Sequence, residues 1–222
     1  MNIEKIHCKV GPYNITLVDT PGFDDTSRSD TEVLILIANW LRDSYKDRTF
    51  LSGIIYLHRI SDPRMSGSSI KNLRMFRKLC GVESMGNVSL VTTMWDKVSR
   101  IEGETRERDL MIGENGFWAA MIASGCLVRR HDGSVGSAQH LIMDLAGNCP
   151  IMLRLQEEIA EGKKLIETEA GVSLNEEIIR VQRQHEEELR SVKEEMELAM
   201  KTGTPPLSIP TFLLTALKGI HD

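Results

Sequence analysis

The sequence predicts an α/β fold, in which a mostly parallel sheet is flanked by helices and followed by a C-terminal helical extension. Apolar stretches of strand length alternate with amphipathic stretches of helix length over the first two thirds of the chain. Polar motifs follow directly on three of these strands, as they do at the ligand-binding edge of a parallel sheet. From residue 151 the composition changes to Glu, Lys, Arg and Gln, with few apolar positions.

The expected elements begin with a hairpin. Residues 4–10 alternate between apolar and polar positions, a Gly-Pro-Tyr-Asn turn follows, and the second strand at 15–18 is more continuously apolar. Apolar spacing then predicts helices at 29–47, 69–81, 104–124 and 134–147, and strands at 51–60, 87–93 and 126–130. The helix at 104–124 is expected to be interrupted by glycines near 113–116. Because helices of this length alternate with the strands, we expect a sheet covered on both faces.

Composition restricts the class of protein. The chain has 222 residues, of which 41% are hydrophobic, and this suits one globular domain plus an extra element. Its net charge of -5, with basic residues scattered, argues against a general nucleic-acid binder. The four cysteines form no CxxC pair, so we expect buried or half-buried free thiols in a reducing compartment. No apolar run reaches the roughly 20 residues of a transmembrane segment, and we expect an intracellular, cytoplasmic protein.

The stretch Leu-Val-Asp-Thr-Pro-Gly-Phe-Asp-Asp, at residues 17–25, follows the second expected strand. A carboxylate at this position, Asp19, can reach the water shell of a Mg²⁺ ion. Gly22 lets a backbone N–H approach a phosphate oxygen without interference from a Cβ atom. The motif therefore predicts a γ-phosphate sensor, although Asp-Thr-Pro-Gly is also ordinary turn chemistry.

A second motif, Thr-Thr-Met-Trp-Asp-Lys-Val at 92–98, follows the strand at 87–93. The carboxylate of Asp96 can accept two hydrogen bonds from the N1–H and N2–H₂ edge of guanine, a donor pair that adenine lacks. Thr93 can brace the loop through its hydroxyl. These two residues predict a guanine-reading loop.

With these two motifs the chain resembles the P-loop GTPase superfamily, of the septin and immunity-associated type, and most of all fungal G-domain proteins that carry a helical C-terminal extension. The resemblance implies a G domain that binds GTP or GDP with Mg²⁺, which Asp19 would hold through water. It also implies that His131 and Asp132 belong to the loop that backs the base. Met94 stands where the family has a Lys over the base, and a Met can cover the base by dispersion.

Two departures limit the GTPase interpretation. No GxxxxGK[ST] phosphate loop occurs in the sequence, and Glu-Gly-Lys-Lys-Leu at 161–165 falls in a charged helix. We therefore expect an N-terminally incomplete G domain with impaired nucleotide binding. Phe23 stands where small GTPases have a water-orienting Gln, so hydrolysis should be slow. Whether the chain is an enzyme stays open, and no catalytic residue is assigned.

The expected domains are an incomplete G domain at 1–149, a helical extension at 150–201 and a Pro-containing apolar tail at 202–222. Residues 174–200 carry apolar residues at three- and four-residue steps, which suit either a short coiled coil that binds a partner or a second copy, or a solvated helix. The apolar tail is expected to dock on the body, with a partner or lipid contact as the alternative.

Two functions from different classes remain open. One is a nucleotide switch whose phosphate loop is missing from this sequence. The other is a non-catalytic scaffold, a degenerate GTPase that presents its C-terminal helix to partners. A metal-dependent hydrolase is a weaker third interpretation, since no second carboxylate cluster or nucleophile lies near Asp19 in the sequence.

Overall fold

The computed structural model describes residues 3–23, 29–112 and 116–175, and four single positions beyond them. Contacts divide the chain into two compact units, Met1–Asn175 and Glu176–Asp222. In the second unit the described positions 187, 190, 192 and 194 are helical, and Arg190 Nε lies 3.9 Å from Glu194 Oε1. The coiled-coil prediction falls almost entirely outside the described residues, and the prediction for the apolar tail does so completely.

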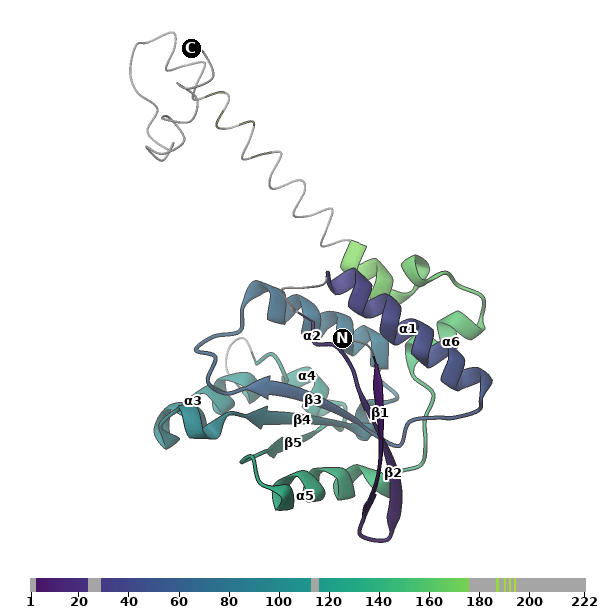
Figure 1. Cartoon of the computed structure of the whole chain (residues 1–222). Coiled ribbons are helices and arrows are strands. Elements are labelled where there is room, and N and C mark those ends of the chain that lie inside the picture. The colour runs from purple at the N-terminus through teal and green to yellow at the C-terminus, as the bar shows by residue number, and fades with distance from the viewer. Residues whose placement is uncertain are drawn as a thin grey trace, which may run out of the picture. The chain divides into compact units, whose positions relative to one another are not determined.

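A parallel sheet lies at the centre of the first unit. It consists of β3 (Ile54–Arg59), β4 (Val88–Thr93) and β5 (Leu127–Arg130), in the order β3-β4-β5. The middle strand β4 is the most deeply buried of the three, as its apolar sequence predicts. In Figure 1 helices α2 and α5 lie on either side of these strands. The predicted fold class, an α/β fold with a parallel sheet flanked by helices, is confirmed.

The N-terminal hairpin forms as predicted but makes a sheet of its own. Strands β1 (Glu4–Val10) and β2 (Tyr13–Asp19) pair antiparallel, with Glu4 opposite Asp19. The tight turn between them places Gly11 at a φ of 56°, a conformation that favours glycine. In the described part of the chain no strand pairing joins this hairpin to β3. Helix α5 nevertheless contacts both β1 and β4, and so it touches both sheets.

The helices begin and end where their capping residues predict. Helix α1 (Asp30–Lys46) begins at a capping box, in which Ser29 Oγ accepts from the Glu32 backbone N–H and the Glu32 carboxylate accepts from the Ser29 N–H. Helix α2 (Gly67–Cys80) ends at Gly81, whose φ is 79°.

None of the described helices is long and apolar enough to span a bilayer.

Three further helices are described between residues 100 and 146. The single helix predicted at 104–124 is instead two, α3 (Arg100–Met111) and α4 (Ala119–Ala123). Ser99 caps α3 by accepting a hydrogen bond from the Glu102 N–H, which places its start earlier than apolar periodicity alone suggested. Helix α5 (Val135–Ala146) is capped by Ser134 and matches its prediction closely.

The first part of the C-terminal extension packs on the body. Helix α6 (Arg154–Ala160) contacts α1 and α2. The Gln156 Nε2 group donates to Leu41 O at 3.1 Å and to Ser44 Oγ at 3.4 Å. Gln156 is buried, as is Glu158, because the extension turns these polar groups inward onto partners. The domain boundaries at 149/150 and 201/202 stay predictions.

The cysteines are all free. Cys80 and Cys126 are buried and Cys8 is half-buried, as expected, whereas Cys149 is exposed. Burial raises the pKa of the Cys126 thiol to about 11, so this sulfur stays protonated and unreactive at neutral pH.

Candidate functional site

The carboxyl ends of β4 and β5 bring two of the predicted loops side by side. Thr92 lies opposite Arg130 in the parallel register, and the backbone N–H of His131 donates to Thr92 O at 2.8 Å. Because these residues end neighbouring strands, the loop that begins at Thr93 and the loop that begins at His131 leave the same edge of the sheet. This juxtaposition was predicted from the order of the strands.

The loop after β4 is held open toward solvent. The Thr93 hydroxyl donates to His58 O at 3.3 Å and so ties the end of β4 to β3. Met94 adopts the left-handed conformation, with a φ of 60°, and its side chain is 45% exposed. The short 3-10 helix η2 (Trp95–Lys97) follows. The Asp96 carboxylate is exposed and lies 2.9 Å from Lys97 Nζ, and this hydrogen bond lowers the pKa of Asp96.

A cluster of four side chains supports this loop, with Thr92 and Glu107 buried, Trp95 half-buried and Arg130 exposed. The Trp95 indole N–H donates to the carbonyl and hydroxyl oxygens of Thr92 at 3.2 and 3.1 Å. Arg130 lies over the Trp95 ring, 4.3 Å from its centroid, and its guanidinium donates to both carboxylate oxygens of Glu107. Glu107 is 8% exposed and also accepts from the Thr92 hydroxyl. The cluster therefore ties the loop to β5 and α3.

Sequence reasoning missed the residues of this cluster. A tryptophan inside a polar strand–helix loop was the available signal, since such a ring needs an apolar or cationic surface to cover it. Glu107 lies on an otherwise polar helix, and nothing in its neighbourhood indicates that it is buried. Glu107 and Arg130 are 23 positions apart in the sequence, so their pairing is a tertiary contact that periodicity does not predict.

The loop after β5 is fixed by short polar contacts. The His131 Nδ1 atom lies 2.6 Å from Ser137 Oγ. The Asp132 Oδ1 atom accepts the Ser134 N–H at 2.9 Å, and hydrogen bonds from Ser134 hold the pKa of Asp132 well below its usual range. Asp132 thus shapes the turn that leads into α5. Both residues lie beside the Thr93–Asp96 loop, where the resemblance to GTPases expects the base-backing loop.

The predicted phosphate sensor lies at the end of the hairpin. Asp19 is the last residue of β2 and is exposed, as is Gly22, where an added Cβ would meet nothing within 4 Å. Phe23, by contrast, packs partly buried against the hydrophobic core. In the described part of the chain, no hydrogen bond or ion pair joins Asp19 or Gly22 to the loops after β4 and β5. The roles predicted for these site residues stay predictions.

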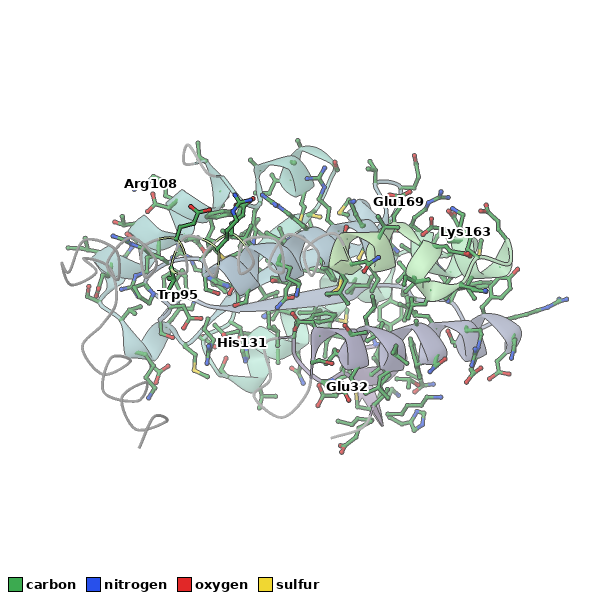
Figure 2. The ribbon with its side chains drawn as sticks, turned by 90° about the horizontal axis from the view of Figure 1, so that it is seen from above. Glu32, Trp95, Arg108, His131, Lys163 and Glu169 are labelled. Carbon is green, nitrogen blue, oxygen red and sulfur yellow. The ribbon has the colours of Figure 1, made fainter. Side chains whose placement is uncertain are left out.

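The Gly-Lys-Lys sequence in the extension has a structural role. The Lys163 Nζ atom lies 2.8 Å from Glu158 Oε1, and Glu158 Oε2 accepts the Glu169 N–H at 3.0 Å. The Glu158 side chain is fully buried, so Lys163 neutralises a charge that burial would otherwise penalise. In Figure 2 Lys163 and Glu169 lie at the opposite end of the molecule from Trp95. Lys163 therefore cannot serve the loop that contains Asp96.

The donor atoms available to a metal are few. Across residues 3–23, 29–112 and 116–175, no group of three or more His, Cys, Asp or Glu side chains could hold a metal ion. Magnesium in nucleotide sites takes one or two carboxylates, and waters and substrate phosphates supply its other ligands. Asp19 is an exposed carboxylate and so offers one ligand of this type.

The chain was compared with known proteins. No protein-family model matches its sequence, and no curated protein does. Three similar solved structures are of Toc33 from Arabidopsis thaliana. A dimerization-deficient mutant gives a TM-score of 0.48 at 14% identity, over 66% of this chain and 68% of that one.

The other two Toc33 structures are complexes. The complex with Mg²⁺ and GMPPNP gives a TM-score of 0.46 at 18% identity, over 61% of this chain and 58% of that chain. The complex with GDP and Mg²⁺ gives a TM-score of 0.47 at 14% identity, over 66% and 69%. Because all three TM-scores lie below 0.5, the function of this chain has to be argued from its own residues.

Proposed function

We propose that this chain is the base-reading part of a P-loop GTPase domain, a guanine-nucleotide switch that binds GTP or GDP with Mg²⁺. The observation that carries the proposal is the exposed carboxylate of Asp96, which follows the buried strand β4 on a loop anchored by Trp95. Among the described residues, its side-chain partner is Lys97, a flexible side chain that a base edge can replace. A carboxylate held in this way accepts the two adjacent N–H groups of guanine.

The neighbouring residues complete a base site in this proposal. Met94 projects from a left-handed backbone position and is 45% exposed, so its thioether is available to cover one face of the base. His131 and Asp132 belong to a turn fixed by hydrogen bonds to Ser137 and Ser134, and they back the base from the next strand. These loops leave one edge of the sheet, where α/β proteins bind ligands.

The phosphate-binding half of the site is incomplete in these 222 residues, and the open edge of β3 supports this. Strand β3 ends the parallel sheet, yet Leu57 on it is 62% exposed. An apolar strand with an unpaired edge is unusual, because it invites another strand to pair with it. Helix α5 contacts both β1 and β4, so it already bridges the two sheets. We infer that a strand carrying the phosphate loop inserts between β2 and β3 and joins the two sheets.

The proposed activity is switching rather than rapid hydrolysis. Asp19 and Gly22 would sense the γ-phosphate and the metal at the end of β2, and loss of the phosphate would release this segment. Phe23 packs against the core and has no group that could orient a water molecule. Hydrolysis by the completed domain is therefore expected to be slow.

Nucleotide titration by calorimetry tests the proposal. The chain as it stands should bind GTP weakly or not at all, since it has no phosphate loop. A form extended at its N-terminus by a strand and a GxxxxGK[ST] loop should bind GTP and Mg²⁺. Tight GTP binding by the unextended chain would contradict the argument about the missing loop.

Asp96→Asn in the extended form separates base reading from phosphate binding. An Asn offers one donor and one acceptor, which match xanthine instead of guanine. Affinity for GTP should fall about a hundredfold, because the Asn NH₂ group opposes one N–H donor of guanine and the remaining hydrogen bond no longer ends on a charged group. Affinity for XTP should rise. Asp43→Asn, at an exposed carboxylate on α1, is the control, and equal effects from the two variants would disprove the base-reading role.

The alternative function is a non-catalytic scaffold, a degenerate GTPase that presents its C-terminal helix to protein partners or to a second copy. The missing phosphate loop and the polar sequence at 174–200 favour it. Light scattering at several concentrations distinguishes the two functions when it is combined with the titration. Self-association without any nucleotide binding by the extended form supports the scaffold, whereas a monomer that binds GTP removes the reason for it.

A further inference from the structure

A pocket of about 820 Å³ lies between α2, α3 and the loop that follows β3. We propose that this pocket binds a small organic anion, a molecule in which an apolar or aromatic body carries a phosphate or carboxylate group. This inference does not depend on the proposed guanine site. It rests on three features of the lining: an apolar floor, a rim of arginines without acidic partners, and a rigid wall.

The floor of the pocket is apolar. Leu73 of α2 and Leu110 of α3 are both buried, and Phe117 and Met65 add to the same surface. Pockets of about 300–1,000 Å³ with such floors enclose most of a small organic ligand. The body of the ligand would rest here, and its burial would supply the non-directional part of the affinity.

Three arginines on the rim have no acidic partner among the residues that the structure describes. Arg64, Arg74 and Arg77 line the pocket and are exposed, and among the described residues none of the three makes an ion pair or a side-chain hydrogen bond. Most other arginines of this unit are paired, for example Arg129 with Asp144 at 2.6 Å. A guanidinium matches the geometry of phosphate and carboxylate oxygens, and two of them on successive turns of α2 can bind one anionic group.

The charge of the lining is opposite to that of the whole chain. Four arginines line the pocket against two aspartates, Asp62 and Asp109, while the chain carries a net charge of -5. Asp62 is already engaged, since its carboxylate lies 3.3 Å from Arg59 Nε. The pocket is therefore a positive site on an acidic protein, and it would attract an anion that the rest of the surface repels.

One wall of the pocket is held rigid. Arg106 donates from Nη1 to Ile60 O and Ser61 O, both at 3.0 Å, and from Nη2 to Glu102 at 2.9 Å. These bonds fix the start of the loop after β3 against α3, so the site is formed before a ligand enters. Preformed sites lose less conformational entropy when they bind. Arg106 thus positions the wall, and Arg64, Arg74 and Arg77 are the anion-binding groups.

Binding of phenyl phosphate to the full chain, measured by calorimetry, tests this proposal. Phenyl phosphate should bind more tightly than inorganic phosphate, which lacks the apolar body, and than phenol, which lacks the charge. Benzoate tests whether a carboxylate can replace the phosphate. Of benzoate and phenyl phosphate, the one that binds more tightly identifies the head group of the natural ligand. Because the His58 ring lines the pocket and packs edge-on against Trp118 at 5.9 Å, tryptophan fluorescence should change on binding.

The decisive variants are Arg74→Gln and Arg77→Gln, both at exposed positions that leave the fold intact. Each should weaken phenyl phosphate binding roughly tenfold, as expected for one charge-assisted contact. Arg108→Gln is the matched control, because Arg108 is also exposed and lies on α3 but is not part of the lining. It should leave the affinity unchanged.

Three outcomes would overturn the proposal. The first is equal weakening by Arg108→Gln, which would indicate a general effect of surface charge. The second is equal affinity for phenyl phosphate and inorganic phosphate, which would remove the role of the floor. The third is loss of phenyl phosphate binding in Asp96→Asn, which would assign the ligand to the loop after β4. GTP titrations can fail or succeed without affecting any of these results.

Discussion

Arg130 lies over the ring of Trp95, 4.3 Å from its centroid, and connects the last strand of the sheet to the loop that presents Asp96. The same guanidinium donates to both carboxylate oxygens of Glu107 on α3. One side chain therefore supports the loop through its ring contact and neutralises a buried carboxylate beneath it. The position of Asp96 depends on this arrangement.

Arg130→Gln should lower the free energy of unfolding by about 2 kcal/mol, because Glu107 is left buried without its partner. This loss of stability is smaller than for a fully buried ion pair, since the Arg130 side chain is 48% exposed. Urea denaturation followed by circular dichroism measures it, and Trp95 fluorescence should change even before unfolding. Arg100→Gln breaks an exposed pair with Glu104 and should cost less than about 0.5 kcal/mol. Equal losses would disprove the role of the cluster.

Gly171 is expected to tolerate no side chain. A Cβ atom there would lie 1.9 Å from the carbonyl oxygen of Leu165, so the backbone of the extension would have to move. Gly171→Ala should therefore destabilise the first unit by about 2 kcal/mol or more, in the range of overpacked cores. Gly136→Ala in α5 is the control, because a Cβ there approaches no atom closer than 3.9 Å. That change should be neutral or stabilise by up to about 1 kcal/mol. Thermal unfolding of the two variants measures this difference in stability.

Gln156 anchors α6 to α1, and Gln156→Ala should release it. The substitution leaves the buried Leu153 N–H without its acceptor, at a cost of about 1–3 kcal/mol. It also removes the hydrogen bonds from Gln156 to Leu41 O and Ser44 Oγ, which keep only their bond to each other. Gln139→Ala on the exposed face of α5 should cost almost nothing. Limited proteolysis should cut the Gln156 variant faster after residue 150. Identical cleavage of both variants would show that the extension is held by other contacts.

Stability is expected to fall below about pH 6.5 because of His58. Burial of this ring lowers its pKa in the folded state, so the folded protein binds fewer protons than the unfolded chain. The stabilisation is then present above the unfolded pKa and is lost as the pH falls. Urea unfolding at pH 7.5 and 5.5 should show the difference, and His58→Gln should reduce it. An unchanged pH dependence in that variant would assign the effect to another group.

Much of the fold was predictable because it follows from local patterns. The hairpin turn at Gly11, the capping box at Ser29 and the stop at Gly81 are each determined by a few neighbouring residues. The break between α3 and α4 was seen only as an interruption, since a polar helix start at Ser99 carries no apolar period. The separation of the hairpin from the parallel sheet involves long-range pairing, which the order of elements leaves open.

The site was predictable to a similar degree. Asp96, Thr93 and His131 follow apolar strands, and strand order alone places them at one edge of the sheet. Glu107 and Arg130 were missed because a buried ion pair between distant positions resembles two ordinary surface charges in the sequence. The pocket beside α2 was missed for the same reason, since Arg74 and Arg77 read there as the polar face of an amphipathic helix.

The hairpin is a two-stranded ribbon that extends from Asp19 to helix α5. Its seven-residue strands pair only with one another in the described part of the chain, so the ribbon is a separate two-stranded element about 20 Å long. One end carries Asp19, and at the other end the turn rests on α5, where an added Cβ on Gly11 would lie 3.2 Å from Met143 Sδ. A continuous ladder of strand pairs therefore joins the exposed carboxylate of Asp19 to the helix that also contacts β4.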